Sequence, residues 1–112
     1  MDEKIINKSI IEFKEQAVQK YSDFIDQIYL FGSCARGDYD NESDIDVLVI
    51  VDTSASSIRE CKNKLLDISS DIGLENNVFL SLVVSEKEEW DKNKDFSLLY
   101  KNVLSEGVRY YG

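Results

Sequence analysis

Residues 31–49 read FGSCARGDYDNESDIDVLV, and this stretch decides the fold. Gly32 and Ser33 come directly after the apolar residues 28–31, and after ten further residues an Asp-Ile-Asp triplet, residues 44–46, leads into the most apolar part of the chain. A glycine at the end of a strand lets the backbone turn and lets a bulky anion approach its N–H groups. Ser33 adds a hydroxyl donor, and a helical turn after it would aim free N–H groups at a phosphate. The pattern therefore predicts a phosphate-binding turn.

Asp44 and Asp46 are the candidate metal ligands and catalytic residues. They begin a predicted strand, in which alternate side chains share a face, so their Cβ atoms lie about 7 Å apart on one side. At that spacing two carboxylates can hold the same divalent ion or pair of ions. Ligation by oxygen alone favours Mg²⁺, which prefers one or two carboxylates together with substrate phosphates.

Two further residues of this stretch are candidates for nucleotide binding. Arg36 is the only basic residue between Lys20 and Arg59, and a guanidinium can bind phosphate oxygens bidentately. It can equally pair with the acids around it. Ser43 precedes the first aspartate and can serve either the nucleotide or the local backbone, as a hydrogen-bonding cap.

Apolar spacing predicts the elements around this stretch. The predicted order is a helix over residues 3–20, a strand over 28–31, a loop over 32–43 with room for one helical turn, a strand over 44–51, a helix from Ser57 to Gly73, a strand over 78–84, a short helix capped by Ser85, and a last helix marked by Phe96, Leu99 and Val103 and closed by Gly107.

The site itself constrains the sheet. If the turn at Gly32 and the two aspartates form one site, the end of the first strand lies beside the start of the second, and such neighbours are antiparallel. The second and third strands are joined by a full helix, which permits a parallel crossover pair. We therefore expect an α/β (α+β) domain with a mixed sheet of three to four strands flanked by helices.

Composition excludes several classes of function. The chain has 112 residues, and 13 Lys and Arg against 22 Asp and Glu give a net charge of −9. An acidic chain without a basic cluster is a poor candidate for direct nucleic-acid binding. The absence of His excludes a Ser-His-Asp triad and zinc sites with His ligands. Chemistry carried out by carboxylates remains open.

Length and patterning set the remaining expectations. A chain of 112 residues is expected to form a single domain over residues 1–112. No apolar run approaches the roughly 20 residues of a membrane span, and we expect a cytoplasmic protein that does not bind membranes. The acids at positions 38, 40 and 42 are expected to form a solvated loop. Cys61 and Trp90 are expected to be packing residues, and Cys34 a small residue tolerated in the loop.

Gly-Ser, ten residues and then Asp-x-Asp resembles the signature of the DNA polymerase β-like nucleotidyltransferase superfamily. The form GSCARG followed by SDIDVLV is similar to its minimal, MNT-type branch, and residues 99–108 are similar to that branch's C-terminal helix. The resemblance covers about residues 5 to 110 of the chain.

This resemblance implies a function. The family uses ATP or another NTP with Mg²⁺, one or two ions, and transfers NMP while releasing pyrophosphate. Gly32 and Ser33 would hold the triphosphate with help from Arg36, and Asp44 and Asp46 would bind the metal. Members of this size are typically the antitoxin half of a prokaryotic pair and transfer AMP to a tyrosine of a helical HEPN-family RNase. The absence of an accessory substrate-binding domain is consistent with an acceptor supplied by such a partner.

One position departs from the family pattern. Active members usually carry a third carboxylate on the next strand, and the matching residue here is Ser81 or, as the second choice, Phe79. This departure keeps two other functions open. One is a binding module of the same fold that neutralises its partner by contact alone, and the other is an enzyme that modifies a small hydroxylated compound.

Overall fold

A computed structural model describes residues 1–112. The helices are α1 (Glu3–Tyr21), α2 (Ser33–Arg36), α3 (Ile58–Asn76), α4 (Lys87–Asn93) and α5 (Leu98–Glu106), and the strands are β1 (Ile25–Phe31), β2 (Ile45–Val51), β3 (Leu80–Glu86) and β4 (Val108–Tyr111). None of these helices combines the length and the apolar character that crossing a membrane requires.

The two long helices form where apolar side chains recur every three or four residues. The buried residues of α1 include Ile6, Ile10, Phe13 and Ala17, and those of α3 include Cys61, Leu65, Ile68 and Ile72. Both helices begin at a side-chain cap, because an Asp2 oxygen accepts the N–H of Ile5 and the Ser57 hydroxyl accepts the N–H of Glu60. The apolar spacing that predicted both helices and the helix start at Ser57 are therefore confirmed, but Ile58, the first apolar residue of α3, is 39% exposed.

The four strands form one mixed sheet in the order β3-β2-β1-β4. β1 pairs antiparallel with β2, which in turn pairs parallel with β3 through the α3 crossover. Both predicted pairings are confirmed, and so is the α/β class. β4 pairs antiparallel with β1 at the opposite edge. The sequence reading allowed a fourth strand but did not locate it.

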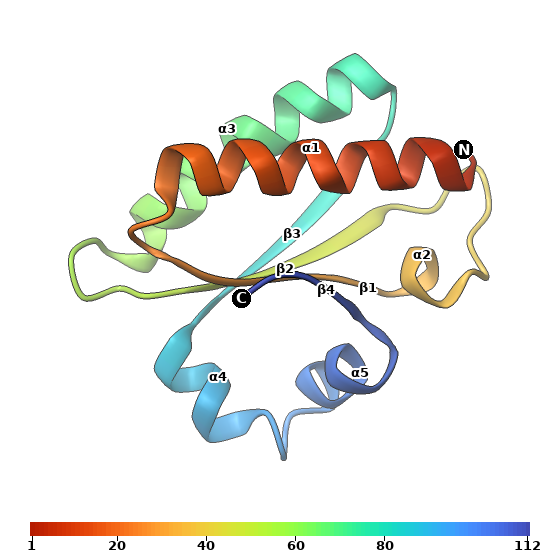
Figure 1. The fold of residues 1–112 in the computed structure, drawn as a ribbon. Coiled ribbons are helices and arrows are strands. Elements are labelled where there is room, and N and C mark those ends of the chain that lie inside the picture. The colour runs from red at the N-terminus through yellow and green to blue at the C-terminus, as the bar shows by residue number, and fades with distance from the viewer.

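The sheet lies between two layers of helices (Figure 1), and a group of buried side chains packs on each of its faces. α1 and α3 cover one face, against which Ile45, Val47 and Val49 of β2 pack. α4 and α5 lie on the other face, where Trp90 and Tyr100 pack on Leu48 and Ile50. Both faces of β2 are thus buried beyond its first residues, as predicted for a central strand.

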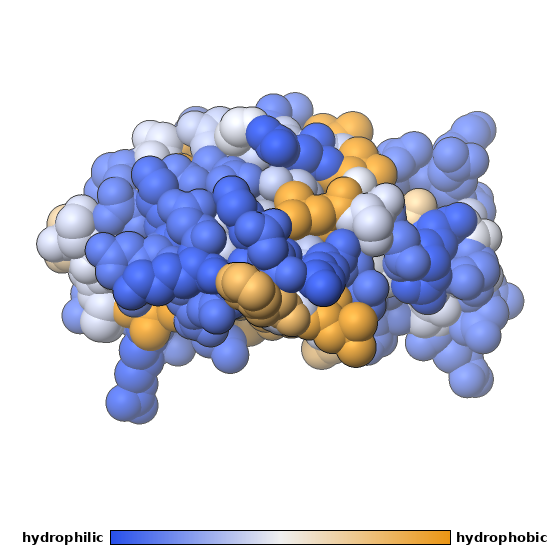
Figure 2. Space-filling model, turned by 90° about the horizontal axis from the view of Figure 1, so that it is seen from below, coloured by the Kyte–Doolittle hydropathy of each residue, from blue (hydrophilic) through white to orange (hydrophobic).

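The face that carries α4 and α5 also exposes apolar side chains among hydrophilic ones (Figure 2). Phe96 is 80% exposed and lies before α5, so its predicted place in the last helix is wrong. The helix begins instead directly after Ser97, which caps it: the Ser97 hydroxyl accepts the N–H of Tyr100. Gly107 ends α5, as predicted.

Two other predicted helix boundaries are wrong. α3 runs past Gly73 and ends at Asn77, which adopts the left-handed conformation with φ 55°. Gly73 is needed for a different reason, because a Cβ there would lie 2.8 Å from the Val78 carbonyl oxygen of the returning chain. Ser85 does not cap α4; it is buried at the end of β3, where its hydroxyl accepts the Tyr100 hydroxyl proton over 2.9 Å.

Strand ends differ from the sequence reading by one to three residues. β1 starts three residues earlier than predicted, at Ile25, and β2 starts one residue later, at Ile45. β3 spans Leu80–Glu86 in place of residues 78–84. These shifts leave the pairing around the predicted site unchanged.

Candidate active site

Gly32 connects the two halves of the predicted site. It ends β1 with φ 74°, a conformation that favours glycine, and directly precedes α2. A Cβ atom at this position would collide with the Oδ2 oxygen of Asp46. Only a residue without a side chain therefore lets the turn approach this carboxylate.

The turn that follows is a single helical turn, as the sequence allowed. The Gly32 carbonyl accepts the N–H groups of Ala35 and Arg36, and the N–H of Gly37 returns to the Ser33 carbonyl. The first N–H groups of such a turn have no partner within the helix, so they are available to an anion. The buried Cys34 thiol donates to the Asp44 carbonyl over 3.4 Å, which ties the turn to the start of β2.

Asp44 and Asp46 lie where β2 begins, on the sheet face that carries α4 and α5. Asp46 is half-buried and pairs in register with Phe31, the last residue of β1, while Asp44 is exposed. Burial raises the pKa of Asp46, and the nearby charge of Asp44 raises it further, whereas Arg36 lowers it. Two carboxylates held this close repel each other unless a cation binds between them.

The donor set fits a hard divalent cation. Neither aspartate forms an ion pair with a basic side chain, so all their oxygens remain available as ligands. No group of three or more acidic or cysteine side chains lies close enough to hold a metal by itself, so substrate oxygens would have to complete the coordination.

Ser81 occupies the position beside Asp46 on the neighbouring strand. The parallel register of β2 and β3 pairs Asp46 with Ser81 and Ile45 with Leu80. Of the two positions considered for a third carboxylate, Ser81 is thus the one that pairs with Asp46 within the sheet. Phe79 precedes β3 and is 63% exposed.

Arg36 is paired with carboxylates in this structure. Its Nε donates to Asp38 and its Nη1 to Glu106 at the end of α5, both over 3.2 Å. All three side chains are exposed, so each pair is weak and open to exchange with another anion. Phosphate binding would require Arg36 to leave one of these partners.

Ser43 stabilises the loop in front of β2. Its hydroxyl accepts the N–H of Asp40 over 2.9 Å, and its own N–H donates to the Asp40 carbonyl. Of the two roles considered, this contact matches the local backbone role. The acids at positions 38, 40 and 42 are exposed, as predicted for a solvated loop.

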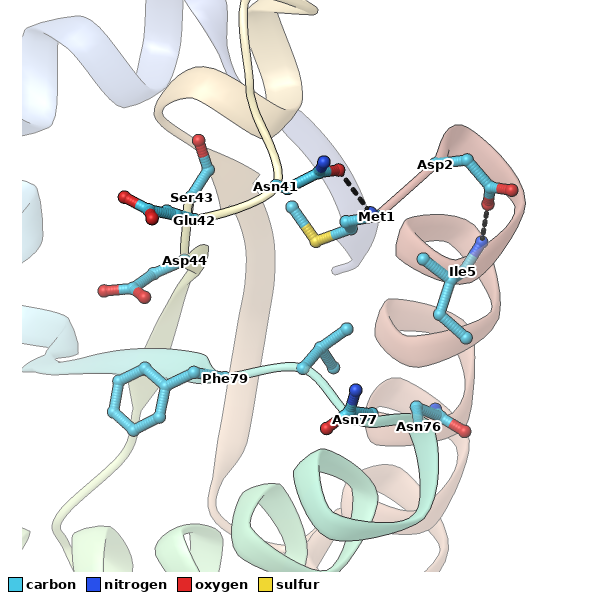
Figure 3. Close-up of a pocket in the computed structure, with 11 residues that line it drawn as sticks. Met1, Asp2, Ile5, Asn41, Glu42, Ser43, Asp44, Asn76, Asn77 and Phe79 are labelled. Carbon is cyan, nitrogen blue, oxygen red and sulfur yellow. Dashed lines mark hydrogen bonds between the residues drawn. The ribbon is translucent and has the colours of Figure 1, made fainter.

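A polar cavity of about 560 Å³ lies behind the first aspartate (Figure 3). It is bordered by the 41–44 loop, the start of α1 and the chain between α3 and β3. The carboxylates of Glu42 and Asp44 point to the same side as the Phe79 ring, away from Met1 and Ile5. The carboxylates therefore face outward from the sheet, toward open solvent.

Glu106 is the residue of this region that sequence reasoning missed. It lies 70 positions from Arg36 along the chain, and only the packing of α5 brings the two together. No local pattern marks it, since one acid next to a helix-ending glycine is common. The ion pair between Glu106 and Arg36 can therefore be recognised only in the folded structure.

Comparison with known proteins adds an independent observation. A family model described as a nucleotidyltransferase domain matches residues 10–109. A protein of Methanocaldococcus jannaschii named as a candidate protein adenylyltransferase is 38% identical over 104 residues, which cover 93% of this chain and 96% of the relative. A second candidate protein adenylyltransferase of the same organism is 40% identical over 78 residues, or 70% of this chain and 77% of the relative.

Two solved structures share the fold. One is a mutant of the toxin-antitoxin MntA-HpeT and the other is a toxin-antitoxin with AMP-PNP. Each aligns with 100% of this chain and 74% of its own chain at a TM-score of 0.59 and 20% identity. At this identity the likeness concerns the fold alone.

Proposed function

The chain belongs to the nucleotidyltransferase domain family, and from this premise we propose that it transfers AMP from ATP to a hydroxyl group of a protein. The predicted polymerase β-like nucleotidyltransferase fold is confirmed by the mixed sheet and its structural neighbours. The names of the two relatives support AMP as the transferred group and a protein as the acceptor. In this proposal residues 1–112 act as a single minimal domain in the cytoplasm, where ATP and Mg²⁺ are abundant.

The proposed roles follow from the geometry of the turn and the strand. The absence of a side chain at Gly32 lets the turn lie against the Asp46 carboxylate, and the Ser33 hydroxyl and the first N–H groups of α2 donate to the triphosphate oxygens. Asp44 and Asp46 hold one or two Mg²⁺ ions, which when bound would neutralise the triphosphate and make its α-phosphorus a better electrophile. Arg36 exchanges a carboxylate partner for a phosphate oxygen.

The reaction is an in-line displacement. The acceptor oxygen forms a bond to the α-phosphorus while the bond from this phosphorus to its bridging oxygen breaks. Pyrophosphate leaves with that electron pair, and the hydroxyl proton passes to solvent. The chain contributes position and charge to this step, which needs no histidine.

A single observation carries the proposal: the turn at Gly32 and the carboxylate of Asp46 are packed so closely that a Cβ at residue 32 would overlap the carboxylate. A triphosphate bound at the turn would therefore lie within reach of cations held by the aspartates. An ordinary strand-ending turn has no need of such closeness to a half-buried carboxylate that lacks a basic partner.

The acceptor in this proposal is a tyrosine of a helical HEPN-family RNase, and the chain is its antitoxin. Two observations support a partner of this kind. Solved proteins of the same fold are described as toxin-antitoxin assemblies. The net charge of −9 also favours association with a basic protein, such as an enzyme that binds RNA.

The test is a transfer assay with a HEPN-family RNase as the acceptor protein. With ATP and Mg²⁺ we expect the RNase to gain the mass of one AMP on a tyrosine and to lose its RNase activity. A chelator should prevent both changes. Replacement of that tyrosine by phenylalanine should prevent the mass gain and identify the acceptor hydroxyl.

The pairing of Ser81 with Asp46 favours a second candidate function. Because Ser81 supplies no third carboxylate, the chain could keep the fold and neutralise its partner by contact alone. The same assay separates the two functions. Loss of RNase activity without a gain of mass supports the binding module, and a measurable rate of AMP transfer removes it.

A further inference from the structure

The free edge of the sheet lies next to the carboxylate pair. β3 is the outermost strand of the order β3-β2-β1-β4 and has no neighbour on its outer side. The N–H of Ile45 donates to the Phe79 carbonyl over 2.9 Å, so the odd-numbered residues of this segment bond toward β2. Since successive residues of a strand alternate, the backbone N–H and C=O groups of Leu80, Leu82 and Val84 point outward.

This edge lacks the usual protection against pairing. Residues 80–85 read LSLVVS, so the only charged residue of β3 is its last, Glu86, and the strand has no proline and pairs with β2 without a bulge. Sheet edges in natural proteins are usually blunted by lysine, proline, bulges or short strands. β4, at the opposite edge, has only four residues and carries Arg109. The edge of β3 is therefore the one suited to accept another strand.

An apolar groove runs along this edge. A cleft of about 740 Å³ separates α3 from β3 and is lined by Leu66 and Leu74 of α3 and by Leu80 and Leu82 of β3. Leu74 is 83% exposed and Leu66 is 38% exposed. The groove also reaches Ser81, so one of its walls continues to the strand position beside Asp46.

The groove and the carboxylates lie on opposite faces of the sheet. α3 covers the face on which Leu80 packs, whereas Asp46 lies on the same face as Leu48, which packs under α4 and α5. A strand added to β3 would send alternate side chains to these two faces. It would lie about 10 Å from β2, which is two strand spacings away.

We propose that the β3 edge and the α3 groove bind an extended segment of the acceptor protein, with the acceptor hydroxyl side chain directed to the carboxylate face and its two apolar sequence neighbours held in the groove. This inference rests on the proposed function. It defines the substrate as a loop or terminal segment of the partner, in which apolar residues directly precede and follow the modified residue. Backbone pairing supplies affinity, and the groove supplies specificity.

The net charge of the chain and the position of the groove favour a partner segment over a second copy of the chain at the β3 edge. A second copy of the chain would also fit an open edge, but two chains of net charge −9 repel each other. A neutral or basic partner segment has no such penalty. Continuity of the groove with Ser81 further favours a segment that must deliver a hydroxyl to the site.

The test uses the full-length chain and the HEPN-family RNase as the acceptor probe. The double variant Leu66→Glu with Leu74→Glu should raise the KM for the RNase about tenfold or more, because it places two charges where apolar side chains bind, with kcat and ATP affinity unchanged. Leu98→Glu is the matched control, since Leu98 is 74% exposed on α5 and should change nothing. Addition of the RNase should also slow hydrogen exchange at the N–H groups of Leu82 and Val84.

Each outcome is decisive. Transfer by the wild-type chain together with an unchanged KM in the double variant overturns the groove and leaves the proposed function standing. If the wild-type chain binds the RNase but transfers nothing, AMP transfer fails, and the dissociation constants of the same variants decide the groove. If the wild-type chain forms a dimer, and the double variant is a monomer while the Leu98→Glu control stays dimeric, the edge binds a second copy of the chain and the proposed occupant is wrong. If the wild-type chain neither binds the RNase nor transfers AMP to it, both proposals are overturned.

Discussion

Ser81 on β3 lies directly opposite Asp46 on β2 in a parallel register that has no bulge. Side chains at paired positions of parallel strands share a face, so a carboxylate at residue 81 would lie beside the two carboxylates of β2. In the proposed metal site, the position of a third ligand is thus occupied by a hydroxyl in place of a carboxylate. Whether a hydroxyl suffices at this position distinguishes the proposed enzyme from the alternative binding module.

The first prediction concerns that position. Ser81→Asp should raise the kcat of AMP transfer by about tenfold, because a third carboxylate adds a ligand for the cation that assists the attacking hydroxyl. Ser81→Asn has nearly the same size without the charge and should leave kcat unchanged. An equal or lower rate in the aspartate variant would show that this position does not limit the reaction.

The second prediction compares two glycines with positive φ, 74° at Gly32 and 90° at Gly37. Gly37→Ala should lose about 1 kcal/mol of stability because its backbone is left-handed, and Gly32→Ala should lose more, because φ 74° with ψ −157° is adopted almost only by glycine. Gly32→Ala should in addition weaken ATP binding at least about tenfold, since its Cβ would displace the Asp46 carboxylate, whereas a Cβ at Gly37 meets nothing within 4 Å. Chemical denaturation and calorimetry with ATP measure the two effects, and equal ATP affinities in both variants would contradict this role of Gly32.

The third prediction follows from the raised pKa of Asp46. Between the ordinary value of 3.8 and its raised value the folded chain binds more protons than the unfolded chain, so the free energy of unfolding falls as pH rises through that window. Asp46→Asn removes this penalty and should raise the Tm of the metal-free protein at pH 7. The gain should disappear toward pH 4, and a lower Tm at pH 7 would contradict the assignment of burial and the Asp44 charge as causes.

The fourth prediction tests whether Arg36 exchanges partners. Glu106→Gln removes one of its two ion pairs and should raise the affinity for ATP about two- to threefold, the scale of an exposed pair. Arg36→Gln should lower it about tenfold, because a charge-assisted hydrogen bond to phosphate is lost. Calorimetry with ATP measures both, and an Arg36→Gln variant of unchanged affinity would leave Arg36 as a partner for the loop and α5 only.

Local signals explain how much of the fold could be predicted. The stripes of α1 and α3 repeat over several turns, and the long apolar run of β2 marks a central strand, so the order of elements through α5 followed from the sequence, although β4 was not located. Both central pairings followed from the expectation that Gly32 and the aspartates form one site and from the helix that joins β2 to β3. Element ends were less certain because they depend on contacts between distant segments. Ser85 illustrates this, since the pattern of a helix cap was overridden by its hydrogen bond to Tyr100.

The site shows the same division. Gly32 and Asp46 were expected together from their spacing, and the structure places them in contact. The pair of Arg36 with Glu106 and the groove between α3 and β3 could not be predicted, because each arises from segments that only the folded sheet brings together. A short apolar strand such as residues 80–85 gives no sign of lying at an edge.

The most direct test of the central claim is AMP transfer by Asp44→Asn and Asp46→Asn variants with radiolabelled ATP, Mg²⁺ and the HEPN-family RNase. Glu42→Gln is the control, because Glu42 is an exposed acid of the same loop with no side-chain partner in the site. We expect transfer to fall by about three orders of magnitude or more in each aspartate variant, the scale on which groups that stabilise a transition state act, and to persist in the control. Transfer at the wild-type rate in both aspartate variants would contradict the assignment of Asp44 and Asp46 as the metal-binding catalytic pair.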